Sequence, residues 1–160
     1  MYKGRDLRYS TVRKVCDFIR RQLKGDEGDL TAGDICAREL VSVTASDTLR
    51  SAVEKMIEGG FDQLPVFERK ELVGAIVHHD LMQSVAGGED FAGMADRPVR
   101  DFMRPPFPVV DESESTGVLK MLLLHCQAVL VRIGGKVGGI VTWADVLDLR
   151  RAKAIRKRCL

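Results

Sequence analysis

The stretch Gly139-Ile-Val-Thr-Trp-Ala-Asp145 has a counterpart earlier in the chain, Gly74-Ala-Ile-Val-His-His-Asp80. In each copy a glycine and a short apolar run predict the end of a buried strand, and an aspartate follows in the first turn of a helix. At the same offset of 65 residues, Lys55-Met-Ile57 matches Lys120-Met-Leu122. An internal repeat of this length predicts a fold built from two similar units.

Both halves of the chain have the same expected order of elements: a short helix or turn, an extended segment, a helix, two strands and a closing helix. Near the start of each half the offset changes to 67, where Asp34-Ile-Cys36 matches Asp101-Phe-Met103. A change of two residues indicates a small insertion. The predicted class is therefore α/β (α+β), with two tandem β-α-β-β-α repeats.

The element boundaries follow from capping residues and glycines. In the first half we expect an extended segment at 41–44, a helix from Ser46 or Asp47 to Gly59-Gly60, strands at 64–67 and 72–77, and a helix from His79 or Asp80. Glycine ends a helix because it adopts the left-handed conformation of a C-terminal cap. In the second half the corresponding elements are expected at 109–110, 115–124, 128–131, 137–141 and from Trp143.

The repeat divides the chain into five parts. They are a basic helix and linker at 1–30, a first repeat at 31–86, a glycine-rich linker of low structural content at 87–96, a second repeat at 97–149 and a basic tail at 150–160. Apolar residues at helical spacing predict a helix over 9–24.

The charge is balanced overall, with 25 basic and 23 acidic residues, but basic residues gather at both ends. Such ends can attract nucleic acid or an acidic partner, although a charge run is more often a solvated helix face. We favour the second interpretation. Nucleic-acid binding stays the less favoured alternative.

The repeated junction suits nucleotide binding. Glycine allows a ligand or another backbone to approach, and free amides at a helix start favour anionic oxygens. Thr142 supplies a hydroxyl for a phosphate, and Asp145 supplies acceptors for a ribose diol. The alternative is that Thr142, Asp145 and Asp80 only cap their helices, since these residue types are common there for that reason.

The pattern of glycine, two aliphatic residues, Thr or Ser, two variable residues and Asp resembles the nucleotide signature of the cystathionine-β-synthase (CBS) domain family. The likeness covers about residues 31–149, and Asp62-Gln-Leu-Pro-Val-Phe67 resembles the strand with a central proline of that family. The resemblance implies a CBS pair, or Bateman module, whose two repeats pack around a pseudo-twofold axis with a ligand cleft between them. It also implies an adenosyl ligand: AMP, ADP, ATP or S-adenosylmethionine.

The same resemblance assigns candidate ligand-binding residues. In the second repeat Asp145 corresponds to the ribose-binding aspartate, Thr142 to the phosphate-facing hydroxyl, and Ile140 belongs to the motif. In the first repeat Asp80 is the matching aspartate, and His78 or His79, when protonated, can supply a donor in place of the hydroxyl that is missing at Val77. Backbone groups near the following residues are expected to hold an adenine: Val43, Thr44, Asp62, Gln63 and Leu64.

Departures from the family pattern favour the second motif as the occupied one. Val77 removes a polar contact to phosphate in the first copy, and Leu130 stands where the second copy would have its strand proline. Trp143, beside the second motif, can stack on an adenine or pack within the fold, and we favour packing.

Other functions have little support in the sequence. We find no nucleophile–base pair, no P-loop and no cysteine or histidine spacing typical of a metal site, so we expect neither an enzyme nor a bound metal. Without a membrane span or an apolar leader, a cytoplasmic protein with reduced thiols is expected. The 9–24 helix is similar to the closing helix of helix-turn-helix domains that some archaeal regulators join to CBS pairs; an independent docking helix is the alternative that we favour.

The predicted function is thus a regulatory, ligand-sensing module with no obligatory cofactor. The resemblance further implies a homodimer, formed through the exposed apolar side of helices such as 119–124 and 146–149, and an unidentified protein partner. A DNA-associated regulator and a ligand-free dimerisation scaffold are the alternatives.

Overall fold

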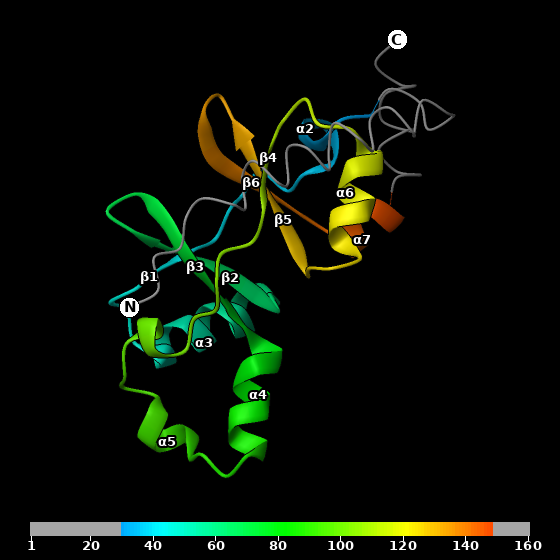
Figure 1. Ribbon diagram of the computed structural model, residues 1–160. Helices are drawn as coiled ribbons and strands as arrows, with labels where there is room; N and C mark the ends of the chain where they lie inside the picture. Colours follow the sequence, from blue (N-terminus) through cyan, green and yellow to red (C-terminus); the bar gives the residue numbers. More distant parts are fainter. Residues whose placement is uncertain (1–29, 149–160) are drawn as a thin grey trace, which may run out of the picture. The chain divides into compact units, whose positions relative to one another are not determined.

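The computed structural model describes residues 30–148, which form parts of two compact units (Figure 1). Unit 1 contains residues 30–39 and 108–148, and unit 2 contains residues 40–107. The helix expected over 9–24 and the basic tail lie outside the described residues. The α+β class and the two repeats in tandem are confirmed. Within residues 30–148, no helix has the length and apolar character that crossing a membrane requires.

Unit 2 holds a three-stranded sheet in the order β1-β2-β3. Its elements are β1 (Val43–Thr44), α3 (Leu49–Gly59), β2 (Gln63–Glu68), β3 (Glu71–Val77), α4 (His78–Ala86), α5 (Phe91–Met94) and the 3-10 helix η1 (Val99–Asp101). β1 runs parallel to β2, and β2 and β3 form an antiparallel hairpin.

Unit 1 has a second sheet in the order β4-β5-β6 with the same directions. Its elements are α2 (Ala32–Ile35), β4 (Val109–Asp111), α6 (Thr116–Leu123), β5 (Ala128–Ile133), β6 (Lys136–Thr142) and α7 (Trp143–Leu147). The register shifts between Val66 and Phe67 in one hairpin and between Val131 and Arg132 in the other. These positions are 65 residues apart, so the internal repeat extends to the irregularities of the strands.

The helices begin and end for local reasons. Thr48, not Ser46 or Asp47 as expected, is the N-cap of α3, and its hydroxyl accepts a hydrogen bond from Ser51 N. The reason is that Asp47 accepts hydrogen bonds from Thr44 instead. Gly60 ends α3 in the left-handed conformation, with a φ of 65°, as the sequence predicted.

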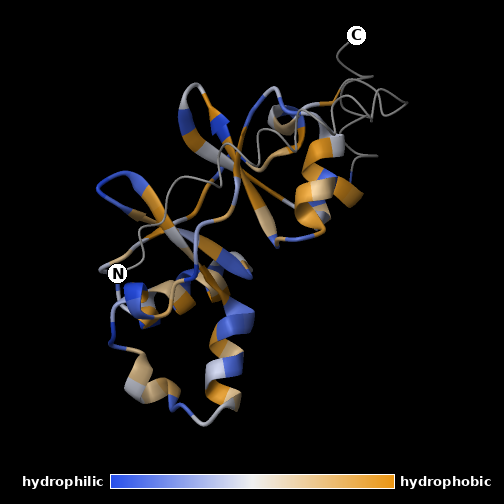
Figure 2. Ribbon diagram, viewed as in Figure 1, coloured by the Kyte–Doolittle hydropathy of each residue, from blue (hydrophilic) through white to orange (hydrophobic). Residues whose placement is uncertain are grey.

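Each unit has its own hydrophobic core between its sheet and its helices. In unit 2 the fully buried Leu49 of α3 and Leu64 of β2 pack in one cluster with Ile76. In unit 1 Leu119 of α6 packs with Val129 and other residues of the sheet. In Figure 2 the strands are mainly hydrophobic, and the turn between β2 and β3 is hydrophilic.

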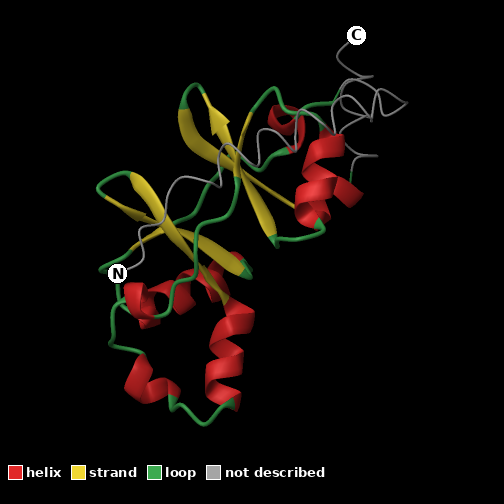
Figure 3. Ribbon diagram, viewed as in Figure 1, coloured by secondary structure: helices red, strands yellow, loops and turns green. Residues whose placement is uncertain are grey.

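The linker expected to have little structure contains the helix α5, which is visible in Figure 3. Asp90 caps this helix by accepting a hydrogen bond from Ala92 N. Met94 and Ala95 are buried in unit 2, and Arg50 N at the start of α3 donates to Ala95 O. The prediction was wrong because the burial of two apolar residues, together with a helix cap, is enough to order this short segment.

The segments around Asp34-Ile-Cys36 and Asp101-Phe-Met103, here called the entry segments, come at the start of each half. Each entry segment packs against the sheet of the other half. Val99 N and Arg100 N donate to Asp47 O and Ala45 O in unit 2. Ala32 N and Gly33 N make the equivalent bonds to Glu114 O and Glu112 O in unit 1. Each compact unit combines the sheet of one repeat with the entry segment of the other repeat.

Candidate functional site

In the second motif, at the end of β6, Thr142 and Asp145 bind each other. Asp145 Oδ2 accepts hydrogen bonds from Thr142 N at 2.7 Å and from Thr142 Oγ1 at 2.8 Å. Both residues are half-buried. The capping role that the sequence left as an alternative is therefore real, and it occupies one oxygen of the carboxylate.

The third residue predicted in this motif, Ile140, is held by the entry segment of unit 1. Ala37 N donates to Ile140 O at 2.9 Å, and Ile140 N donates to Ala37 O at 3.1 Å. Beside this pair, a Cβ added to Gly139 would lie 2.8 Å from Cys36 Sγ. The motif glycine thus makes room for the entry segment of this chain.

The first motif is built differently, because Val77 has no hydroxyl to bind an aspartate. Asp80 Oδ2 instead lies 3.5 Å from Nη1 of Arg104, a residue of the other entry segment. His78 N donates to Asp62 O at 2.8 Å, and the His78 side chain is exposed. Asp80, His78 and Asp62 therefore lie in one unit, near the end of β3.

The remaining predicted residues of unit 2 lie on or beside the sheet. Gln63 pairs with Val77 in the β2–β3 ladder, and the side chains of Val43 and Leu64 are core residues, so these two could meet a ligand only through their backbones. Thr44 N and Thr44 Oγ1 donate to Asp47 at 2.9 Å and 2.7 Å.

The hydrogen bonds from Thr44 also favour the ionised form of Asp47. The backbone hydrogen bond from Thr44, followed by the bond from its hydroxyl, lowers the pKa of Asp47 below its usual value. Asp47 is thus ionised and already engaged at neutral pH. A ligand that uses the backbone of Thr44 has to share the N–H group with this carboxylate.

Trp143 packs within unit 1. Its Nε1 donates a 2.9 Å hydrogen bond to Leu123 O at the end of α6, while part of the ring is exposed. This bond satisfies a carbonyl that a helix end leaves without an intrahelical donor. It agrees with the packing interpretation that we favoured for this residue.

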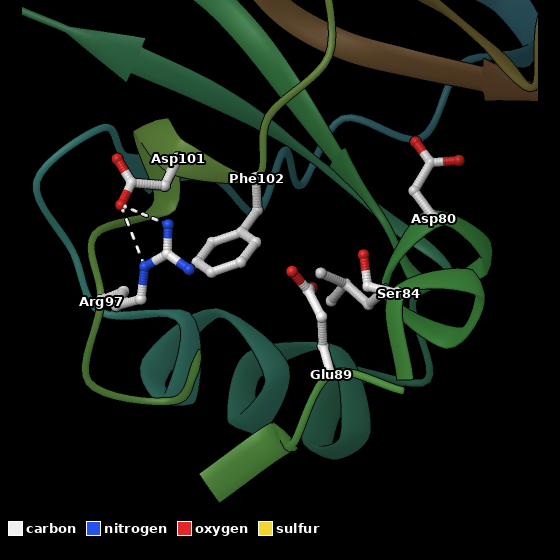
Figure 4. A pocket seen from close by; sticks show the side chains of 7 residues that line it. Asp80, Ser84, Glu89, Arg97, Asp101 and Phe102 are labelled. Carbon is white, nitrogen blue, oxygen red and sulfur yellow. Dashed lines mark hydrogen bonds and ion pairs between the residues drawn. The ribbon is translucent and has the colours of Figure 1, made fainter. Parts of the chain in front are cut away.

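Figure 4 shows a pocket within unit 2, between α4 and η1. On one side of it, Arg97 donates two hydrogen bonds to Asp101 Oδ2, and its guanidinium lies 4.7 Å from the centre of the Phe102 ring. Asp80 is the one predicted site residue that lines it. Its volume of about 240 Å³ is below the roughly 300–1,000 Å³ of pockets that enclose drug-sized ligands. It is therefore too small to be a whole nucleotide site.

The cysteines of unit 1 have the character of packed residues. Burial raises the pKa of both the Cys36 and the Cys126 thiol, and Cys126 Sγ donates to Leu122 O at 3.1 Å. A thiol with a raised pKa is a poor nucleophile at neutral pH. Between residues 30 and 148, no three His, Cys, Asp or Glu side chains gather in a way that could hold a metal ion.

The comparison with protein families is decisive, because the model of the CBS domain matches twice, at residues 32–87 and 99–152. The chain belongs to the CBS domain family. Such a pair is a regulatory module. The two matches coincide with the internal repeat, and each includes one copy of the glycine-to-aspartate motif.

One curated protein is a distant relative of this CBS pair. The protein MJ1232 of Methanocaldococcus jannaschii, described as uncharacterized, is 24% identical over 128 residues, which are 78% of this chain and 41% of that protein. The chain thus spans about two fifths of that relative.

Two solved structures share the fold. The structure of CBSX2 in complex with AMP is 27% identical, with a TM-score of 0.64, and the match covers 80% of this chain and 99% of that one. The CBS pair of MJ0100, in complex with 5′-methylthioadenosine and S-adenosyl-L-methionine, is 21% identical with a TM-score of 0.61 over 74% of this chain and 98% of that one.

The sequence did not identify Arg104 as part of the candidate site. Arg104 follows the entry motif of the second half but pairs with the aspartate of the first. The signal was available in the offset of 67 residues, which matches Arg104 with Ala37 and so marks a charge present in one copy alone.

Proposed function

We propose that this CBS pair senses an adenosyl compound and regulates a protein partner without catalysing a reaction itself. The observation that carries the proposal is the duplicated motif, which places Asp145 and Asp80 at equivalent helix starts in two units of one regulatory module. The AMP bound by CBSX2, at 27% identity, supports an adenine nucleotide as the ligand class.

Each motif offers chemistry suited to such a ligand. Asp145 uses Oδ2 for Thr142, which leaves Oδ1 to accept a hydroxyl of a ribose. Asp80 is about a third exposed and makes a solvent-accessible ion pair, which a ribose diol can replace at small cost. AMP, ADP, ATP and S-adenosylmethionine all carry the ribose that these carboxylates would recognise.

Isothermal titration with AMP, ATP and S-adenosylmethionine tests the proposal directly. We expect binding by the unchanged chain, loss of one binding event in Asp145→Ala and loss of the other in Asp80→Ala. Asp111→Ala is the matched control, because Asp111 is an exposed aspartate whose ion pair with Arg132 lies on β4 and β5. No binding of any of the three compounds would leave a scaffold that acts by dimerisation.

We also infer that the regulatory unit is a homodimer, since each unit presents large apolar side chains to solvent. They are Ile57, Phe61, Met82 and Val85 in unit 2, and Met121, Leu124, Trp143 and Leu147 in unit 1. The sequence predicted a dimer contact through an exposed apolar side of helices 119–124 and 146–149. Leu119 and Val146 cannot belong to that contact, because both side chains are buried in the core. Association with a second copy through these side chains would remove them from water.

Sedimentation equilibrium measures this assembly. Ile57 and Leu147 are each 76% exposed, so Ile57→Glu and Leu147→Glu are expected to yield folded monomers. Glu54→Lys, which changes an exposed charge on the same helix as Ile57, is the control. A monomer at high concentration in the unchanged chain contradicts the dimer.

A further inference from the structure

The two motif copies differ in the residue that the entry segment places beside them. In unit 2, Ala75 N donates to Arg104 O at 3.0 Å and Arg104 N donates to Ala75 O at 2.9 Å. In unit 1 the same two bonds join Ile140 to Ala37. The equivalent backbone position therefore carries a guanidinium in one copy and a methyl group in the other.

Packing fixes the Arg104 backbone against the motif. A Cβ added to Gly74 would lie 2.7 Å from Met103 Sδ and 2.9 Å from Arg104 O, so the absence of a side chain at Gly74 lets the two backbones approach closely. The side chain is less constrained, because Arg104 and Asp80 have 45% and 34% of their side chains exposed. An ion pair this exposed is weak, so a phosphate can compete with Asp80 for the guanidinium.

We propose that Arg104 makes the Asp80 motif selective for phosphorylated nucleosides over uncharged ones. The planar fork of a guanidinium matches two phosphate oxygens, and the bonds are charge-assisted. The Asp80 copy lacks the threonine hydroxyl at Val77, and Arg104 supplies the missing phosphate donor from the entry segment. The Asp145 copy discriminates less, because the Thr142 hydroxyl already donates to Asp145 and the position equivalent to Arg104 is the uncharged Ala37.

This inference rests on the proposed function. Titration with AMP and with adenosine distinguishes a failure of the Arg104 role from a failure of the proposed function. In a chain carrying Asp145→Ala, adding Arg104→Ala is expected to weaken AMP binding by about tenfold and to leave adenosine binding within about twofold. Arg50→Ala is the matched control, because Arg50 is an exposed arginine of unit 2 that pairs with Asp96. The control is expected to change neither affinity.

The reciprocal variant keeps the test independent of any loss of stability in Arg104→Ala. Ala37 is exposed, so Ala37→Arg in an Asp80→Ala chain is expected to raise the ratio of AMP to adenosine affinity at the Asp145 motif. Equal weakening of both ligands by Arg104→Ala, tighter AMP binding or no change overturns the role of Arg104. If the unchanged chain binds neither compound, the proposed function fails as well; if only the Asp145→Ala chain binds neither, the Arg104 inference fails alone.

Discussion

Unit 1 and unit 2 share strand order, strand direction and the position of a register shift, yet they hold their motif aspartates in different ways. Asp145 closes a local cap with Thr142, three residues away, whereas Asp80 reaches Arg104, which is far along the chain. Two side-chain differences accompany this contrast: Val77 in place of the Thr142 hydroxyl, and Arg104 in place of Ala37. Duplicated folds can thus keep their backbone while the side chains of one copy take a new role.

The largest difference between the units is expected in the stability lost when each motif glycine, Gly74 or Gly139, is replaced by alanine. Gly74→Ala should destabilise the chain by about 1–3 kcal/mol, because the new Cβ meets the Arg104 carbonyl as well as Met103. Gly139→Ala should cost less, because the atom in its way at 2.8 Å is the Cys36 sulfur. Urea unfolding monitored by circular dichroism measures both free energies.

Second variants sharpen this contrast. Cys36→Ala should recover part of the stability lost in Gly139→Ala, whereas Met103→Ala should recover little in Gly74→Ala, since the carbonyl stays in place. Gly138→Ala is the control, because the nearest atom to its added Cβ is 3.8 Å away. Equal losses at Gly74 and Gly139 would contradict the difference between a backbone and a side-chain neighbour.

The next largest difference between the units is expected in the free energy of unfolding that each motif aspartate contributes. Asp145→Ala is expected to lower the free energy of unfolding by about 1 kcal/mol, the usual loss for a helix cap. Asp80→Ala is expected to change it by less than about 0.5 kcal/mol, because its ion pair is screened by solvent. Thermal unfolding of both variants checks the order, and a larger loss in Asp80→Ala would reverse the comparison.

In unit 2, Asp47 is expected to make the free energy of unfolding depend on pH. Because hydrogen bonds from Thr44 lower the pKa of Asp47 in the folded state, its contribution is fully present above the unfolded pKa of about 3.9 and is lost as pH falls through the folded value. The stability difference between the unchanged chain and Asp47→Asn should therefore shrink between about pH 5 and pH 2. A difference independent of pH, measured by urea unfolding, would show that the carboxylate charge contributes nothing.

The smallest expected effect concerns the thiols, which among residues 30–148 occur in unit 1 alone. In a chain carrying Cys16→Ser and Cys159→Ser, Cys36 and Cys126 should react with a thiol reagent more slowly than a free thiol at neutral pH, since burial raises both pKa values. Labelling followed by mass spectrometry measures the rate, which should rise when urea opens unit 1. Rates equal to those of the unfolded chain at neutral pH would contradict a protected core.

The sequence by itself determined the duplicated α+β fold, because strand and helix periods, glycine stops and the 65-residue offset are local signals that agree with one another. Those signals located α6 and the β5–β6 hairpin closely and gave the family. They misjudged α5 and the start of α3, where a buried Met94 and the bond between Thr44 and Asp47 decide the outcome.

Only the tertiary structure decided what each motif residue touches. The spacing from Thr142 to Asp145 suggested both a cap and a ligand site, and the 2.8 Å bond established the cap. The pairing of Asp80 with Arg104 depends on an entry segment that packs on the other repeat's sheet, and linear spacing carries no information about such a crossing. Spacing along the chain names the candidate partners of a cap, because those residues are neighbours in sequence, whereas the exchange of entry segments appears only once the chain is folded.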